Sequence, residues 1–181
     1  MKIVYSHLLN LLEQKPKLEE LSELLFQLGH EHEIDGEVLD MEITPNRGDC
    51  LSLKGIARDL NYFYQAKELP KSDMTLPALE LQFDNKAQDV CPNISFMQIE
   101  IEQAPTKYEP YLEAYFADLG INRNNFFTDI SNYLAYESGQ PTHCFDQNTM
   151  QGHFSLTKKR LKTKFKTLLD TEIELTDENL V

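Results

Sequence analysis

The sequence is poor in cysteine and contains no CxxC pair. Its three cysteines, Cys50, Cys91 and Cys144, are an odd number at wide spacings. Zinc sites that can be read from sequence usually bring their cysteines in closely spaced pairs, so we expect no zinc site. The pattern favours reduced, partly buried thiols, and we expect a cytoplasmic protein.

Long apolar runs are also absent. No stretch of about 20 apolar residues occurs, so the sequence predicts no membrane-spanning helix and no membrane partner. The first residues, MKIVYSHLLNLL, lack a clean apolar core and a small-residue cleavage site. We therefore do not expect a secretory signal peptide.

Basic residues are scarce. The chain has 17 Lys and Arg against 30 Asp and Glu, which gives a formal net charge of −13. Because clustered positive charge dominates affinity for phosphate backbones, this balance argues against tight binding of nucleic acid by the chain alone. It leaves room for contact with a terminal nucleotide. The basic run Lys158–Lys166 is interpreted as a solvated face in preference to a nucleic-acid contact.

What is present is the composition of a globular protein, with 41% hydrophobic and 26% charged residues. Apolar spacing predicts an α+β fold of two small domains, with helices packed on short, mostly antiparallel or mixed sheets. We expect helices over 6–14, 17–28, from Asp49 or Cys50 to about Leu60, 108–119 and 129–137, and strands over 38–44, 78–83, 94–101 and 154–157.

A linker is predicted at Lys67–Pro77, which has two prolines and mixed charge. We therefore expect one domain over residues 1–73 and another over 74–181. The polar segment His30–Asp35, HEHEID, is compatible with metal ligation or with an exposed connection. No further ligand cluster lies nearby in the sequence, so we prefer the exposed connection.

Asn132 and His143 are the best candidates for chemistry, because they flank a Gly-Gln-Pro turn that could bring them to one cleft. Histidine can relay a proton or hold a water, and asparagine offers a fixed donor and acceptor. A histidine in such a setting can equally be a hydrogen-bonded structural residue. Cys144 as a thiol nucleophile is disfavoured, because neighbouring residues on an extended segment point to opposite faces.

Three segments carry distinctive motifs: ITPNRGDCLSLKGIARDL at Ile43–Leu60, DVCPNISFMQIEI at Asp89–Ile101 and GINRNNFFTDISNYLAYESGQPTHCFD at Gly120–Asp146. Together, and in this order, they resemble the bacterial β subunit of phenylalanyl-tRNA synthetase. Two departures stand out within these segments. Asn93-Ile94 replaces the family's Arg-Tyr, and Ser131 replaces its Thr, with the hydroxyl kept.

The resemblance implies a first structural domain followed by the first part of the editing domain, which hydrolyses tyrosine mischarged on the phenylalanine tRNA. Ser131 and Asn132 would contact the misacylated end, and His143 would act catalytically by positioning the water or the terminal ribose. The family's inserted tRNA-docking barrel has no room between Gly29 and Val38. The acidic residue that recognises the tyrosine hydroxyl is expected beyond Val181.

The leading hypothesis is a segment or truncated paralogue of this β subunit, contributing to assembly and to the editing site. The resemblance implies the α subunit, or the remainder of the β subunit, as partner. A homo-oligomer and weak contact with the tRNA acceptor end are also open. No cofactor is expected for this segment, since ATP and magnesium would serve the whole synthetase, and no aminoacylation is expected. The alternatives are a non-catalytic interaction module and a free-standing hydrolase of misacylated tRNA.

Overall fold

A computed structural model describes residues 1–67, 75–150, 153–158, 163–167, 171–176 and 178–181. The chain divides into two compact units that interleave along the sequence. The first unit comprises residues 1–72 and 103–144, and the second comprises 73–102 and 145–181. The predicted α+β class is confirmed. The first stretch ends next to the predicted boundary at residue 73, and the domains 1–73 and 74–181 remain a prediction about independent folding.

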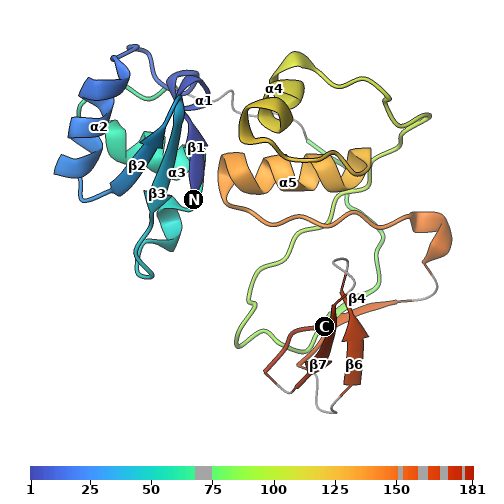
Figure 1. Cartoon of the computed structure of the whole chain (residues 1–181). Coiled ribbons are helices and arrows are strands. Elements are labelled where there is room, and N and C mark those ends of the chain that lie inside the picture. Colours follow the sequence, from blue (N-terminus) through green and yellow to red (C-terminus); the bar gives the residue numbers. More distant parts are fainter. Residues whose placement is uncertain (68–74, 151–152, 159–162, 168–170, 177) are drawn as a thin grey trace. The chain divides into compact units, whose positions relative to one another are not determined.

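A three-stranded antiparallel sheet forms the centre of the first unit. It consists of β1 (Lys2–Val4), β3 (Val38–Glu42) and β2 (Glu31–Asp35), in the order β1-β3-β2 (Figure 1). Along β3, Leu39 and Met41 are buried while Asp40 and Glu42 are exposed. This alternation confirms the strand predicted at 38–44, and it gives the sheet one apolar face that helices must cover.

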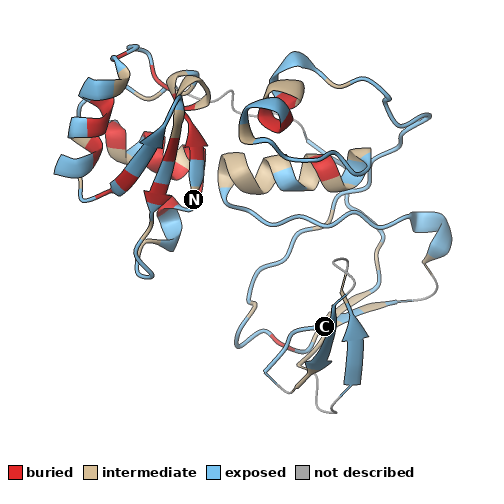
Figure 2. Ribbon diagram, in the orientation of Figure 1, coloured by how far each residue is buried: buried red, intermediate tan, exposed pale blue. Residues whose placement is uncertain are grey.

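Three helices pack with this sheet to complete the hydrophobic core of the first unit. They are α1 (Tyr5–Leu9), α2 (Leu18–Gln27) and α3 (Leu53–Leu60), and their buried faces appear red in Figure 2. Fully buried side chains of the core come from β1, β3 and the three helices, with one more from Leu12 shortly after α1: Ile3, Leu8, Leu12, Leu21, Leu25, Leu39, Ile56 and Leu60. Each such side chain stabilises the fold by roughly 1.5–3 kcal/mol relative to exposure, so the core rests on the leucine spacing.

The helix expected to begin at Asp49 or Cys50 begins later. A 3-10 turn, η1 (Gly48–Cys50), comes first, and α3 then begins at Leu53. Ser52 is the N-cap, because its Oγ accepts a 3.0 Å hydrogen bond from the amide of Gly55. Asp and Ser are equally favoured as capping residues, so the sequence alone could not decide between Asp49 and Ser52.

The prediction that His30–Asp35 is an exposed connection was wrong. Residues Glu31–Asp35 form strand β2, and His30 and His32 are buried. The ring of His32 lies 2.8 Å from the Ser22 hydroxyl through Nε2 and 3.0 Å from the carbonyl of His30 through Nδ1. These partners satisfy the polar ring of His32, so it can be buried without the cost of an unpaired polar group.

Two further helices belong to the first unit. They are α4 (Pro110–Leu119) and α5 (Phe126–Ser138), and each ends at a glycine with positive φ: Gly120 at 62° and Gly139 at 76°. The helix predicted over 108–119 is confirmed, with its start at Pro110. The helix predicted over 129–137 begins earlier, because Asn125 caps it by accepting a 3.1 Å hydrogen bond from the amide of Thr128.

The second unit contains two small sheets. Strand β4 (Phe83–Asn85) pairs in parallel with β5 (Phe154–Leu156), and β6 (Thr163–Lys166) pairs antiparallel with β7 (Glu172–Leu175). A 3-10 turn, η2 (Gln147–Thr149), precedes β5. Within the described residues, no helix is long and apolar enough to cross a membrane.

Two strand predictions in this unit need correction. The strand expected at 78–83 is found instead at Phe83–Asn85, and residues 94–101 form no strand. Alternation predicts a strand only when a core face receives the apolar side chains. Here Met97 and Ile99 are 62% and 64% exposed, so that face is not buried.

Close packing around Gly55 ties α3 to the preceding turn. A Cβ on this residue would lie 2.1 Å from the carbonyl oxygen of Asp49 and 2.9 Å from the Cα of Cys50. Both contacts are with backbone, which cannot rotate away as a side chain can. Only glycine therefore fits at this position.

We predict that Gly55→Ala lowers the free energy of unfolding by about 1–3 kcal/mol, because the added methyl group must displace backbone. Urea denaturation followed by circular dichroism measures the change. The matched control is Gly48→Ala, where a Cβ meets nothing within 4 Å. Equal stability of the two variants would contradict the close approach.

Candidate functional site

Helix α5 is held at its beginning by a buried carboxylate. Asp129 is 0% exposed. It accepts hydrogen bonds of 2.6 Å from the Tyr108 hydroxyl and 2.9 Å from the amide of Asn124. Asp129 lies in the first turn of the helix. A buried carboxyl group with two hydrogen-bond donors fixes the start of α5.

A tyrosine fixes the last turn of α5. Tyr136 accepts a 3.2 Å hydrogen bond from the amide of Val4, and its oxygen also lies 3.2 Å from His7 Nδ1. Its ring packs against Tyr115 of α4 at a centroid distance of 5.1 Å. Burial raises the pKa of the Tyr136 phenol to about 12, so the hydroxyl remains protonated near neutrality. An ion pair between Lys54 of α3 and Glu137 of α5, at 3.0 Å, also connects these two helices.

The three residues predicted for the editing site lie on α5 and on the segment that follows it. Ser131 is half-buried, whereas Asn132 and His143 are exposed. Gly139 ends the helix in the left-handed region, which turns the chain. The Ser131 hydroxyl then lies 4.0 Å from the thiol of Cys144. The segment after Gly139 therefore returns along α5, as Figure 1 also shows.

This return places the neighbours of Asn132 and His143 in contact. In the part of the chain that the structure describes, no hydrogen bond joins Asn132 to His143. The expectation that both face one cleft is not tested by these contacts and stays a prediction. Cys144 contacts Ser131 and not a base, which gives no support to a thiol nucleophile.

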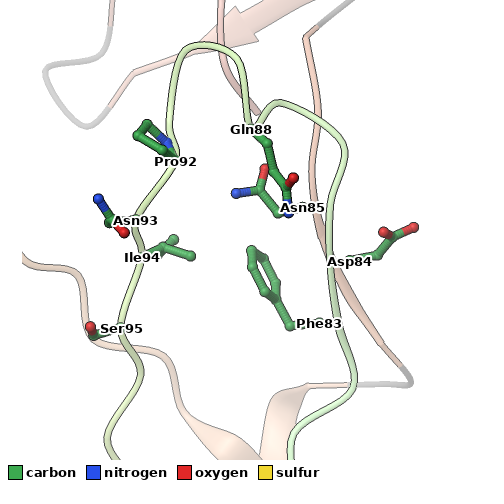
Figure 3. Close-up of a pocket in the computed structure, with 8 residues that line it drawn as sticks. All are labelled: Phe83, Asp84, Asn85, Gln88, Pro92, Asn93, Ile94 and Ser95. Carbon is green, nitrogen blue, oxygen red and sulfur yellow. The ribbon is translucent and has the colours of Figure 1, made fainter.

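A hollow of about 460 Å³ opens in the second unit between the β4 strand and the loop after it. Figure 3 shows Phe83, Asn85, Gln88 and Ile94 pointing toward one another, while Asp84 points away. The amide of Asn85 is already engaged, since it donates 2.8 Å to the carbonyl of Cys91 and accepts 2.9 Å from the amide of Ala87. The hollow is thus shaped by loop-supporting groups, and none of the three predicted site residues lines it.

A second hollow, of about 500 Å³, lies between α4 and α5. Its lining is mainly apolar and aromatic: Tyr111, Ile130, Tyr133, Leu134 and Glu137. Burial raises the pKa of Tyr133, with the nearby Glu137 charge adding to the effect. The predicted site residues do not line this hollow either.

A dense group of charged side chains lies in the first unit, around Asp59 of α3. Arg47 donates to one carboxylate oxygen of Asp59, and Arg58 lies 3.0 Å from the other. His30 Nε2 lies 3.0 Å from the first oxygen. Asp49 balances the two arginines, with a 3.1 Å contact to Arg47 Nε and a further ion pair to Arg58. Two positive and two negative groups therefore share one network.

This network sets the protonation of its members. Partial burial alone would raise the pKa of the Asp59 carboxyl, but hydrogen bonds from Arg47, Arg58 and His30 outweigh it and lower that pKa to about 2. Burial and the adjacent Asp59 charge raise the pKa of the Cys50 thiol to about 12. Cys50 is therefore a protonated thiol near neutrality, with no nucleophilic character. Sequence reasoning missed the network because its members are separated by up to 29 residues.

Comparison with known proteins gives the class of the chain. Residues 99–181 match the B3/4 domain family, and this stretch contains Ser131, Asn132 and His143. Over most of its length, the chain is similar to one particular protein, the phenylalanine–tRNA ligase β subunit. The chain is 34% identical over 158 residues to the phenylalanine–tRNA ligase β subunit of Carboxydothermus hydrogenoformans and 31% identical over 154 residues to that of Thermotoga maritima. It is 29% identical over 156 residues to that of Psychrobacter arcticus.

Each of these alignments covers 82% of the chain and 19% of the relative. The chain thus spans about a fifth of the length of these β subunits. The predicted resemblance to the β subunit of phenylalanyl-tRNA synthetase is confirmed. The B3/4 match, residues 99–181, begins at the end of the stretch 73–102, contains α4 and α5 of the first unit, and includes the whole 145–181 stretch of the second unit.

Because the folded-state pKa of Asp59 lies below the ordinary value of 3.8, its ion pairs stabilise the fold above about pH 4. We predict that this contribution is lost as the pH falls toward about 2. The Asp59→Asn variant lacks the contribution at every pH, so its urea midpoint should fall less steeply on acidification. Asp35→Asn, an exposed change on β2, should keep the wild-type slope. Identical slopes for Asp59→Asn and the wild type would contradict the network.

Proposed function

We propose that the chain serves as part of a phenylalanine–tRNA ligase β-subunit assembly and holds the mischarged end of tRNA beside α5. One observation carries the proposal: the Ser131 hydroxyl lies 4.0 Å from the Cys144 thiol. It brings the segment with His143 back alongside the helix that carries Asn132. The match of residues 99–181 to the B3/4 domain family supports the same stretch.

The three side chains divide the chemistry of ester hydrolysis between them. The Ser131 hydroxyl and the Asn132 amide each offer a donor and an acceptor, which suit a ribose hydroxyl or an ester carbonyl. The exposed imidazole of His143 positions a water for attack on the carbonyl carbon. The C–O ester bond then breaks, and the terminal ribose oxygen leaves with a proton. No group in this scheme requires a cofactor.

A fixed helix suits this role. Asp129 and Tyr136 hold α5 at two points through partly buried hydrogen bonds. Side chains on a rigid element keep their geometry when substrate binds, which lowers the cost of positioning. Ser131 and Asn132 stand in sequence between these two anchors.

The charge of the chain limits how it meets tRNA. With a net charge of −13, the chain repels the phosphate backbone overall. We infer that it engages the aminoacylated terminus alone, and that a partner subunit supplies the basic surface for the rest of the tRNA. The named relatives are β subunits, so the partner would be the α subunit or further β-subunit sequence.

The test is hydrolysis of tyrosine from the phenylalanine-acceptor tRNA by the purified chain at micromolar concentration. We expect tyrosine release that falls by roughly 100-fold or more in His143→Ala, since positioned acid–base groups contribute about 10²–10⁴-fold. His153→Ala is the matched control, because His153 is also an exposed histidine. Release that survives in His143→Ala, or no release from the wild type, would contradict the catalytic part of the proposal.

A second function, a non-catalytic interaction module, is favoured by exposed apolar side chains of the second unit. Met97, Ile99, Phe165 and Ile173 are 62%, 64%, 52% and 41% exposed. Two of them lie on the β6–β7 pair, and an isolated two-stranded sheet is marginally stable in water. A partner or a second copy of the chain would bury these side chains.

If the chain is such a module, we predict that light scattering detects a dimer of the wild type at roughly tens of micromolar. The double variant Met97→Glu, Ile99→Glu should be monomeric at the same concentration. Burying a charge in an apolar interface is costly, so the shift should exceed tenfold in dissociation constant. Lys86→Glu, a charge change at an exposed position, is the control. A monomeric wild type would count against self-association and leave another subunit as the occupant.

A further inference from the structure

Three side chains of different chemistry meet beside the ion-pair network of the first unit. His30 Nε2, Cys50 Sγ and a carboxylate oxygen of Asp59 all lie within 4.8 Å of one another. They come from the residue before β2, from η1 and from α3. His30 is 3% exposed and Cys50 is 0% exposed, so both are presented in a buried setting.

Their spacing matches the geometry of a tetrahedral metal site. Typical zinc distances of about 2.0–2.1 Å to nitrogen, 2.0–2.2 Å to oxygen and 2.3 Å to sulfur place nitrogen and oxygen about 3.3 Å apart, and sulfur and oxygen about 3.5 Å apart. In the structure, His30 Nε2 and Asp59 Oδ2 are 3.0 Å apart. Cys50 Sγ and Asp59 Oδ2 are 3.4 Å apart. These two pairs need shifts of only a few tenths of an ångström, and the His30 and Cys50 ligand atoms lie within 4.8 Å of each other.

We propose that His30, Cys50 and Asp59 bind a divalent transition-metal cation, with Zn²⁺ as the best fit. A nitrogen, a sulfur and an oxygen ligand disfavour Ca²⁺ and Mg²⁺, which take oxygen ligands, and favour zinc or its analogue cobalt. Water fills the fourth position. On binding, the thiol proton of Cys50 passes to solvent and the sulfur donates its electron pair to the metal, so no oxidation or reduction occurs.

Arg47 competes for this position. Its Nη2 lies 2.7 Å from Cys50 Sγ and also contacts Asp59 Oδ2. The guanidinium and a metal cation cannot both use these two atoms. Arg47 is however one-third exposed, and its Nε keeps a 3.1 Å contact with Asp49. It can therefore release the sulfur without losing every ion pair.

Arg58 does not compete in the same way. It lies 3.0 Å from Asp59 Oδ1, whereas the proposed ligand atom is Oδ2, and its contact with Cys50 Sγ, at 3.7 Å, is a full ångström longer than that of Arg47. Asp59 can thus hold Arg58 and a cation at the same time through different oxygens. The cation would connect the start of β2, the η1 turn and α3. This inference does not depend on the function proposed for α5.

The experiment uses the whole chain without an affinity tag, as the double variant Cys91→Ser, Cys144→Ser. Cys50 is then the only thiol, and both changed residues lie outside the buried core. Titration with Co²⁺ should give a thiolate-to-cobalt absorption band in the near ultraviolet that saturates at one equivalent. Zn²⁺ should displace the cobalt and abolish the band.

Further changes in the same background test the ligands. Loss of an outer-shell partner already costs roughly 10–100-fold in metal affinity, so His30→Gln and Asp59→Asn should each weaken Co²⁺ binding by at least tenfold. Arg47→Gln should strengthen it, because the competing guanidinium is removed. His153→Gln, an exposed histidine elsewhere, should leave the affinity unchanged. Circular dichroism verifies that each variant is folded.

Absence of the band at a large excess of Co²⁺ would overturn the proposal. So would a band that keeps its affinity in folded His30→Gln and Asp59→Asn. Weaker binding in Arg47→Gln would also count against it, since Arg47 would then act as a support and not as a competitor.

Discussion

The carboxylate of Asp59 is the constraint on which the N-terminal part of the fold depends. It is only 16% exposed, and it is surrounded by Arg47, Arg58 and His30. A partly buried charge is tolerable only when donors replace the water it has lost. Those donors come from the turn after β3, from α3 itself and from the residue before β2. The charge therefore dictates how these three pieces approach one another.

The close approach at Gly55 follows from the same arrangement. Drawing the η1 turn toward α3 brings the carbonyl of Asp49 against the helix, where no Cβ fits. The ion pairs of Asp59 and the absence of a side chain at Gly55 both allow the η1 turn to pack closely against α3. The ITPNRGDCLSLKGIARDL segment that carries the family resemblance contains Arg47, Asp49, Gly55, Arg58 and Asp59. Its specificity as a motif thus has a physical origin.

Sequence reasoning succeeded where a local rule acts alone. The leucine spacing of α2, the alternation of β3 and the glycines after α4 and α5 each give one signal that no distant residue overrides. It failed for residues 94–101 and for the HEHEID segment, because both outcomes depend on what lies opposite. Exposed Ile99 and buried His32 are decided by tertiary partners that periodicity cannot supply.

The candidate site shows the same division. The turn at Gly139 was visible in the sequence, and it predicts that the chain returns along α5. Which atoms then meet was not visible, and the contact that forms joins Ser131 to Cys144, beside the pair first singled out. The cluster of His30, Cys50 and Asp59 escaped notice for a related reason. Cysteine-pair rules detect ligands close in sequence, whereas these three meet only after the sheet and α3 have packed.

The interleaving of the two units has a consequence for the order of folding during synthesis. The amide of Val4 donates to the hydroxyl of Tyr136, 132 residues further along the chain. The N-terminal sheet can form early from local contacts, but this hydrogen bond from β1 must wait until α5 has left the ribosome. Non-local closure of this kind slows folding. Residues 73–102 are then the loop that the first unit closes, and their own unit can be completed only afterwards.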